Sequence, residues 1–103
     1  TGDEATALTY MNKIRERAYG DASHNYSSLV LNDFIDERAR ELNWECTRRT
    51  DLIRFDLFTS DTYVWPFKGG VDAGAGFNEK YELYPIPTAD IVLNPNLQQN
   101  PGF

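Results

Sequence analysis

The sequence predicts a mainly α-helical chain, in which three helices are followed by a long irregular segment rich in proline and glycine. Apolar residues recur at helical spacing in the first half, whereas all five prolines fall in residues 66–103 and four of the seven glycines in residues 69–76. Because proline and glycine interrupt regular elements, we expect a helical part at residues 1–58 and an irregular part at residues 59–103, with one short extended pair. We refer to residues 59–103 as the strap.

The first helix is expected from about Asp3 to Ala18. Its apolar stripe repeats at intervals of three or four residues and consists of Ala7, Met11, Ile14 and Ala18. Such a stripe is typical of a helix that buries one face. Asp3 suits the N-cap position, and Gly20 can adopt the left-handed conformation that ends many helices.

The second helix is expected after Asn32, a suitable N-cap, and its buried face is marked by Phe34, Ile35 and Leu42. Charged residues share that face, and charges on an apolar face are costly unless they are paired. A third short helix, which ends near Phe58, supplies the partners. The predicted ion network therefore ties the second and third helices together and comprises Arg38, Glu41, Glu45, Arg48, Asp51 and Arg54.

Charge and composition exclude several classes of partner. The chain carries 10 basic and 16 acidic residues, a net charge of −6. This acidic balance would repel a phosphate backbone, so we expect no nucleic-acid partner. Cys46 is the single cysteine, which excludes an internal disulfide. The sequence begins at Thr1 rather than at a methionine, and we interpret it as part of a longer protein.

The sequence contains none of the usual catalytic or metal-binding patterns. His24 is the single histidine and lies in a polar segment where a solvent-facing position is expected, whereas a zinc site needs three or four ligands. Cys46 follows Glu45, whose negative charge disfavours a reactive thiolate, so a buried and inert thiol is expected. No metal, cofactor or active site is therefore predicted.

Glu41 and Glu45 could form the carboxylate pair of a glycosidase, because four-residue spacing places them side by side on a helix. Nearby arginines favour the charged form of both carboxylates, however, whereas a general acid must hold a proton. A structural role is therefore favoured. The segment 69–76 follows Lys68 but lacks the Gly-Lys-Ser/Thr order of a phosphate-binding loop, and we interpret it as a flexible turn.

Aromatic residues crowd into the first half of the strap, and these are Tyr63, Trp65, Phe67, Phe77, Tyr81 and Tyr84. Sugars bind by packing their C–H faces on such rings, with hydrogen bonds that fix their orientation. The alternative is that the rings anchor the strap to the helices, which is the commoner role for any single ring. The candidate ligand-binding residues are Trp65, Tyr63 and Tyr81.

Four motifs, in this order along the chain, resemble the carboxy-terminal region of the SusD/RagB family. They are Ile14–Ala18; Glu37–Leu42 followed by Asp51–Arg54; Tyr63–Trp65 followed by Lys68–Gly70; and Tyr84–Pro87 followed by Asn94–Leu97 and Gln99–Phe103. The resemblance extends over nearly the whole chain from Tyr10 onward. Cys46 replaces a glycine of the family pattern, and Phe103 replaces a common tyrosine. If position 46 requires a positive φ angle, a cysteine is strained there.

This resemblance implies a protein of the bacterial outer membrane that is not an enzyme. It implies a mostly helical fold, with tetratricopeptide-like helices upstream, that binds oligosaccharides without cleaving them. It also implies a surface-exposed lipoprotein of Bacteroidetes-type bacteria, anchored through an upstream cysteine, that acts in nutrient uptake with a TonB-dependent transporter. Residues 1–103 would then pack against the remainder of the parent chain. The alternative is a purely architectural module that docks the transporter, with the sugar contacts made upstream.

Overall fold

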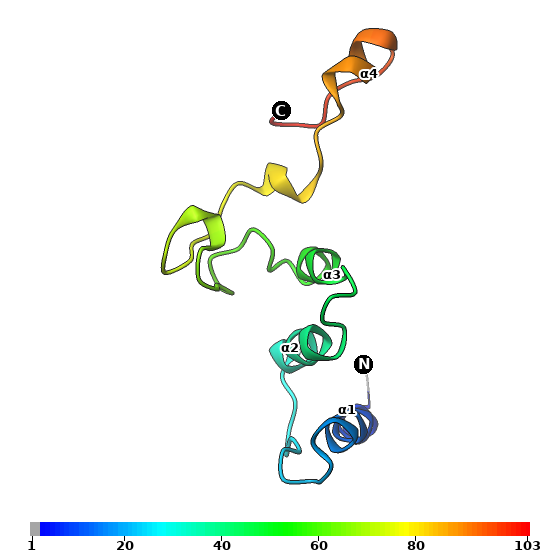
Figure 1. The fold of residues 1–103 in the computed structure, drawn as a ribbon, viewed down its shortest axis with the longest axis vertical. Coiled ribbons are helices and arrows are strands. Elements are labelled where there is room, and N and C mark those ends of the chain that lie inside the picture. Colours follow the sequence, from blue (N-terminus) through cyan, green and yellow to red (C-terminus); the bar gives the residue numbers. More distant parts are fainter. Residues whose placement is uncertain (1–2) are drawn as a thin grey trace. The chain divides into compact units, whose positions relative to one another are not determined.

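The computed structural model describes residues 3–103, and over this range it contains helices and loops but no β-strand (Figure 1). The helices are α1 (Glu4–Tyr19), α2 (Leu31–Glu41), α3 (Arg48–Arg54) and α4 (Thr88–Leu93), and two 3-10 turns are η1 (Lys68–Gly70) and η2 (Glu79–Glu82). The mainly helical class is confirmed, whereas the extended pair expected in the strap is absent from the described residues. The chain divides into two compact units, one ending at Asn43 and the other beginning at Trp44.

Both ends of α1 follow from the residues beside them. The Asp3 side chain accepts hydrogen bonds from the backbone N–H groups of Ala5 and Thr6, which satisfies two of the donors that a helix leaves free at its N-terminus. Gly20 ends the helix at φ 84°, in the left-handed region, and its N–H donates to the Glu16 carbonyl. The predicted cap and stop residues are therefore confirmed.

α2 begins one residue before Asn32, so the prediction that Asn32 caps this helix is wrong. The cap position belongs to Val30, whose backbone N–H donates to the Asp33 side chain at 2.7 Å. Asp33 lies in the first turn of α2, so a residue of the helix itself satisfies the backbone donor at the cap position. α2 ends at Glu41, and Glu45 therefore lies beyond the helix and not on its buried face.

Two residues that follow α2 have left-handed backbone conformations. Trp44 has a φ of 68° and Cys46 a φ of 58°, a region that costs an L-residue roughly 1–2 kcal/mol. The condition for the strain predicted at Cys46, a positive φ angle, is therefore met. The prediction that its thiol is buried is wrong, because Cys46 lies in an exposed turn after the helix and not on a helix face.

A buried ion pair between α1 and α2 holds the first unit together. Arg15 Nη1 lies 2.7 Å from Glu37 Oε2, and both side chains are buried. Arg40 donates to the same carboxylate oxygen at 2.6 Å. Burial alone would raise the pKa of Glu37, but the hydrogen bonds and charges of Arg40 and Arg15 outweigh it, so the pKa is lowered. Glu37 therefore remains a carboxylate inside the unit.

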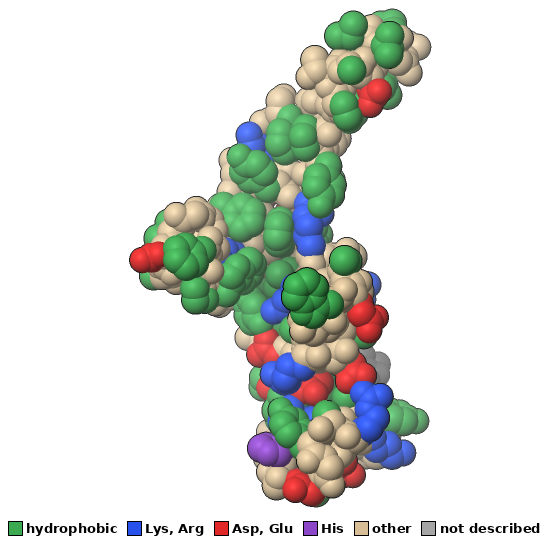
Figure 2. Space-filling view, viewed as in Figure 1, with side chains coloured by type: hydrophobic (Ala, Val, Ile, Leu, Met, Phe, Trp, Pro, Cys, Tyr) green, Lys and Arg blue, Asp and Glu red, His purple; other side chains and the backbone are tan. Residues whose placement is uncertain are grey.

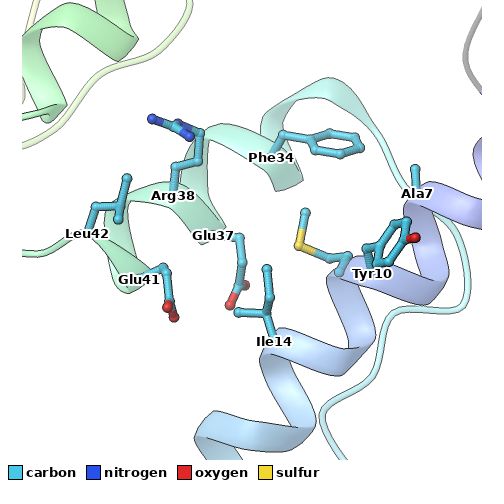
Figure 3. A pocket seen from close by; sticks show the side chains of 9 residues that line it. Ala7, Tyr10, Ile14, Phe34, Glu37, Arg38, Glu41 and Leu42 are labelled. Carbon is cyan, nitrogen blue, oxygen red and sulfur yellow. The ribbon is translucent and has the colours of Figure 1, made fainter.

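Beside this pair, α1 and α2 border a hollow of about 430 Å³ (Figure 3). Its lining residues are Ala7, Tyr10, Met11, Ile14, Phe34, Glu37, Arg38, Glu41 and Leu42. Most of the apolar stripe predicted for the first helix and of the buried face predicted for the second helix meet here. Glu41 also accepts a hydrogen bond from Arg17 of α1, so a further ion pair joins the two helices.

The end of the chain is fixed by the side-chain amide of Gln99. This amide accepts a hydrogen bond from the Ile86 N–H at 2.8 Å and donates to the Ile86 carbonyl at 2.9 Å. Pro85 and Pro87 have no N–H, so Ile86 supplies the backbone donor of this Pro-Ile-Pro segment, and Gln99 satisfies it. The two halves of the fourth motif are thus hydrogen-bonded to each other.

Candidate functional site

The first residues of the strap fold around Lys68, which is only 2% exposed. Its ammonium donates to the carbonyl oxygens of Leu57 at 2.8 Å and Tyr63 at 2.6 Å, and to that of Ser60. A buried charge is costly unless it is hydrogen-bonded, and these three acceptors occupy all three of its N–H groups. Burial lowers the pKa of Lys68, and the charge of Asp61 opposes this effect.

The same ammonium also holds the aromatic pair Tyr63 and Trp65. The Lys68 Nζ atom lies 4.7 Å from the centroid of the Trp65 ring, within the range of a cation–π interaction. The two rings lie 6.5 Å apart at an interplanar angle of 62°. Arg48 donates to the Tyr63 hydroxyl at 2.7 Å. Cations from α3 and from the strap therefore fix both candidate rings.

The glycine-rich segment after Lys68 is built on close backbone contacts. A Cβ on Gly69 would lie 2.8 Å from the Ala75 carbonyl oxygen, and a Cβ on Gly74 would clash with the carbonyl oxygen of Trp65. Both residues also have positive φ angles, of 65° and 79°. Only glycine fits these positions. The segment therefore packs closely against the residues around it, and the expected flexibility of this turn stays a prediction.

Tyr63 and Trp65 line a hollow of about 550 Å³ in the second unit. Its other lining residues are Arg48, Arg49, Leu52, Phe58 and Val64. In Figure 2, hydrophobic side chains gather on the visible face of this unit. Tyr81 lies elsewhere, because its ring packs against Phe77 at 6.1 Å and Phe103 at 5.9 Å. The structure therefore brings together two of the three candidate residues.

Arg49 connects α3 to a later part of the strap. Its Nη2 atom donates to the carbonyl oxygens of Tyr81 at 2.7 Å and Glu82 at 3.1 Å. The guanidinium carbon also lies 5.0 Å from the Phe58 ring centroid and 4.2 Å from that of Tyr84. A planar guanidinium can donate hydrogen bonds and stack on rings at the same time. Arg49 therefore holds this part of the strap next to the hollow.

Comparison with known proteins places the chain in a family. The model of the SusD family matches residues 1–103. The chain belongs to the SusD family. It is 40% identical over 93 residues to starch-binding protein SusD of Bacteroides thetaiotaomicron, an alignment that covers 90% of the chain and 16% of that protein. It is 30% identical over 101 residues to SusD-like protein P25 of Formosa agariphila, covering 93% of the chain and 19% of that protein.

The residues of the predicted ion network have several different partners in this SusD-family chain. Glu41 pairs with Arg17 of α1, a partner that was not predicted. Arg54 lies 4.0 Å from Asp51 within α3, and Arg48 donates to an aromatic hydroxyl of the strap. The predicted tie between the second and third helices through this network stays a prediction.

Four residues with important contacts were not predicted from the sequence. Three of them are buried charged residues, Arg15, Glu37 and Lys68, and the fourth is Arg49, which contacts the strap. Arg15 follows Met11 by four residues, and Glu37 follows Phe34 by three, so helical spacing places both on the predicted buried faces. That spacing could have identified the pair. No comparable periodicity marks Lys68, because its acceptors are backbone carbonyls of an irregular segment.

Three further observations concern chemistry and membrane insertion. His24 is exposed and stacks on Tyr19 with ring centroids 4.1 Å apart, so its predicted solvent-facing position is confirmed. Between residues 3 and 103, no group of three or more His, Cys, Asp or Glu side chains could hold a metal ion. Over the same residues, no helix has the length and apolar character needed to span a membrane.

Proposed function

We propose that the protein captures an oligosaccharide without cleaving it and acts in nutrient uptake at the bacterial outer membrane. In this proposal a TonB-dependent transporter is its partner, and a lipid on an upstream cysteine anchors it at the cell surface. The observation that carries the proposal is the 40% identity over 93 residues to a relative named for starch binding, within the SusD family. The chain spans less than a fifth of the length of that relative and of P25, so the activity belongs to the longer protein.

The hollow beside Tyr63 and Trp65 supports a direct contribution of this region to capture. Its volume of about 550 Å³ lies within the usual range of small-ligand sites, roughly 300–1,000 Å³. Both rings are partly exposed, and they offer apolar faces on which sugar C–H groups can pack. Arg48, which donates a hydrogen bond to the Tyr63 hydroxyl, lies beside them. Tyr81, which is 48% exposed, would provide a separate contact outside the hollow.

The alternative is an architectural module that docks the transporter while upstream regions contact the sugar. Large exposed apolar side chains favour it, notably Trp44 at 93% and Phe67 at 70% exposure. Exposed apolar surface of this kind is typical of interaction sites when it is contiguous. In this role the same surface could also pack against the remainder of the parent chain.

Titration of the full-length protein against a panel of soluble glycans that includes maltoheptaose tests the proposed function. Calorimetry measures binding, and an assay for reducing ends on the same samples measures cleavage. We expect binding without release of reducing ends. Steady release that is abolished by Glu41→Gln would overturn the proposal in favour of a glycosidase. Absence of binding to every glycan would favour the architectural module.

A further inference from the structure

We propose that Lys68 is a positioning residue for glycan capture, which fixes the Tyr63–Trp65 pair so that one face of the Trp65 ring stays available to a sugar. This inference rests on the proposed function. It assigns a role in recognition to a side chain that does not itself touch the ligand.

The contacts of the ammonium show why Lys68 acts through other residues. Its three N–H groups are directed to the carbonyl oxygens of Leu57, Ser60 and Tyr63. An ammonium has three donors and no acceptor, so none remains for a ligand. With 2% exposure, the side chain also offers almost no surface to solvent. A direct hydrogen bond from Lys68 to a sugar is therefore excluded in this arrangement.

Tyr63 and Trp65 are both fixed by this one group. Lys68 binds the Tyr63 carbonyl at 2.6 Å and lies 4.7 Å from the centroid of the Trp65 ring. Backbone contacts also restrain Trp65. The Lys68 N–H donates to the Trp65 carbonyl at 3.1 Å, and Gly74 packs directly against the same carbonyl. A ring that is held before binding loses less conformational entropy when the ligand arrives.

The geometry also limits which ring face a ligand can use. Lys68 occupies one face of Trp65, so a sugar must pack on the other face. The Tyr63 ring lies beside the Trp65 ring at an interplanar angle of 62°, and Arg48 donates a hydrogen bond to the Tyr63 hydroxyl. Sugar C–H groups suit the other face of the indole ring. An apolar ring face of this kind suits the oligosaccharide of the proposed function.

A double-mutant cycle in the full-length protein tests this role, with maltoheptaose as the probe and calorimetry as the readout. Trp65→Ala should weaken binding about tenfold, as expected for loss of an aromatic contact. Lys68→Met should weaken it about three- to tenfold in the wild-type background and clearly less when Trp65 is already alanine, where only its effect through Tyr63 remains. A general loss of structure would weaken binding in both backgrounds. Lys13→Met is the matched control, because Lys13 also lies over an aromatic ring, that of Tyr10, but in the unit that ends at Asn43.

A spectroscopic measurement separates failure of the inference from failure of the proposed function. In protein labelled with 5-fluorotryptophan, the Trp65 resonance is assigned by its loss in Trp65→Phe. Lys68→Met should shift and broaden this resonance without ligand, and Lys13→Met should not. An unchanged resonance, or an equal effect of Lys68→Met on binding in both backgrounds, overturns the positioning role. If Lys68→Met does not fold, Lys68→Gln provides the same comparison. Failure of the wild-type protein to bind maltoheptaose counts against the proposed function and leaves the spectroscopic test to decide on positioning.

Discussion

At the scale of single residues, Glu37 is a buried carboxylate that pairs with two arginines of the first unit. Arg15 and Arg40 both reach its Oε2 atom, at 2.7 and 2.6 Å. Loss of one partner from a buried pair costs roughly 3–5 kcal/mol, whereas an exposed pair contributes about 0–1 kcal/mol. In the network predicted from the sequence, the Arg54 side chain is 64% exposed. We therefore expect the main electrostatic contribution from Arg15 and Glu37.

The decrease in the free energy of unfolding at acid pH should depend on Glu37. Because its folded-state pKa is lowered below 4.5, the unfolded chain binds more protons than the folded protein between that lowered value and 4.5. The stability from this group is therefore present above pH 4.5 and is lost as the pH falls through the lowered pKa. Glu37→Gln should reduce the free energy of unfolding at pH 7 and flatten its decline in acid, as measured by urea unfolding at a series of pH values.

The control for this experiment is Glu79→Gln, which changes an exposed carboxylate in η2. It should leave the pH profile as it is in the wild-type protein. A Glu37→Gln profile that also matches the wild type would mean that the buried pair contributes nothing to acid stability.

Cys46→Gly should stabilise the protein, because glycine adopts a φ of 58° without the strain that a Cβ causes. Glycine also gains freedom in the unfolded chain, which offsets part of this effect. We expect the free energy of unfolding to rise by about 0.5–1 kcal/mol. Cys46→Ala removes the thiol but keeps a Cβ, so it should give no gain. If the alanine variant is as stable as the glycine variant, the backbone explanation is wrong.

At the scale of elements, sequence patterns predicted helix ends and turns more reliably than contacts. Asp3 and Gly20 end α1 as expected, because capping depends on residues next to the helix. The end of α2 was missed because the left-handed conformation that follows it falls on Trp44, a residue that gives no turn signal.

The candidate site was predicted in part. Tyr63 and Trp65 were identified from their aromatic character, and the structure places them on one hollow. The residues that hold them could not be predicted, because the acceptors of Lys68 are carbonyl oxygens that every residue carries. The contacts of Arg49 span more than thirty positions along the chain and follow no period. Long-range contacts of this kind depend on the folded path of the strap.

Arg49→Lys should loosen the part of the strap around Tyr81. Lysine keeps the charge but cannot donate in a planar fork while it stacks on two rings. Loss of a charged hydrogen bond, worth about 1.5 kcal/mol, should speed hydrogen exchange of the η2 backbone amides roughly tenfold in the full-length protein. Mass spectrometry of exchanged peptides measures this. Arg54→Lys changes an exposed arginine on the same helix and should have no effect, so equal exchange in the two variants would contradict the role of Arg49.

At the scale of the whole molecule, the two compact units carry different features. The unit that ends at Asn43 carries the buried ion pair, and the unit that begins at Trp44 carries the aromatic hollow. Neither the net charge of −6 nor the helical class identifies a ligand. The proposed ligand class rests on the SusD family and on a relative named for starch binding, and the hollow is the proposed place of contact.

The measurement that tests this account most directly is a titration and a thermal melt of Trp65→Ala on the same sample of full-length protein. A capture role predicts that the affinity for maltoheptaose falls about tenfold. It also predicts that stability falls by much less than the roughly 3–5 kcal/mol that truncation of a fully buried tryptophan costs. A loss of that full size, with the affinity kept in the protein that still folds, would contradict the account and assign Trp65 to anchoring the strap.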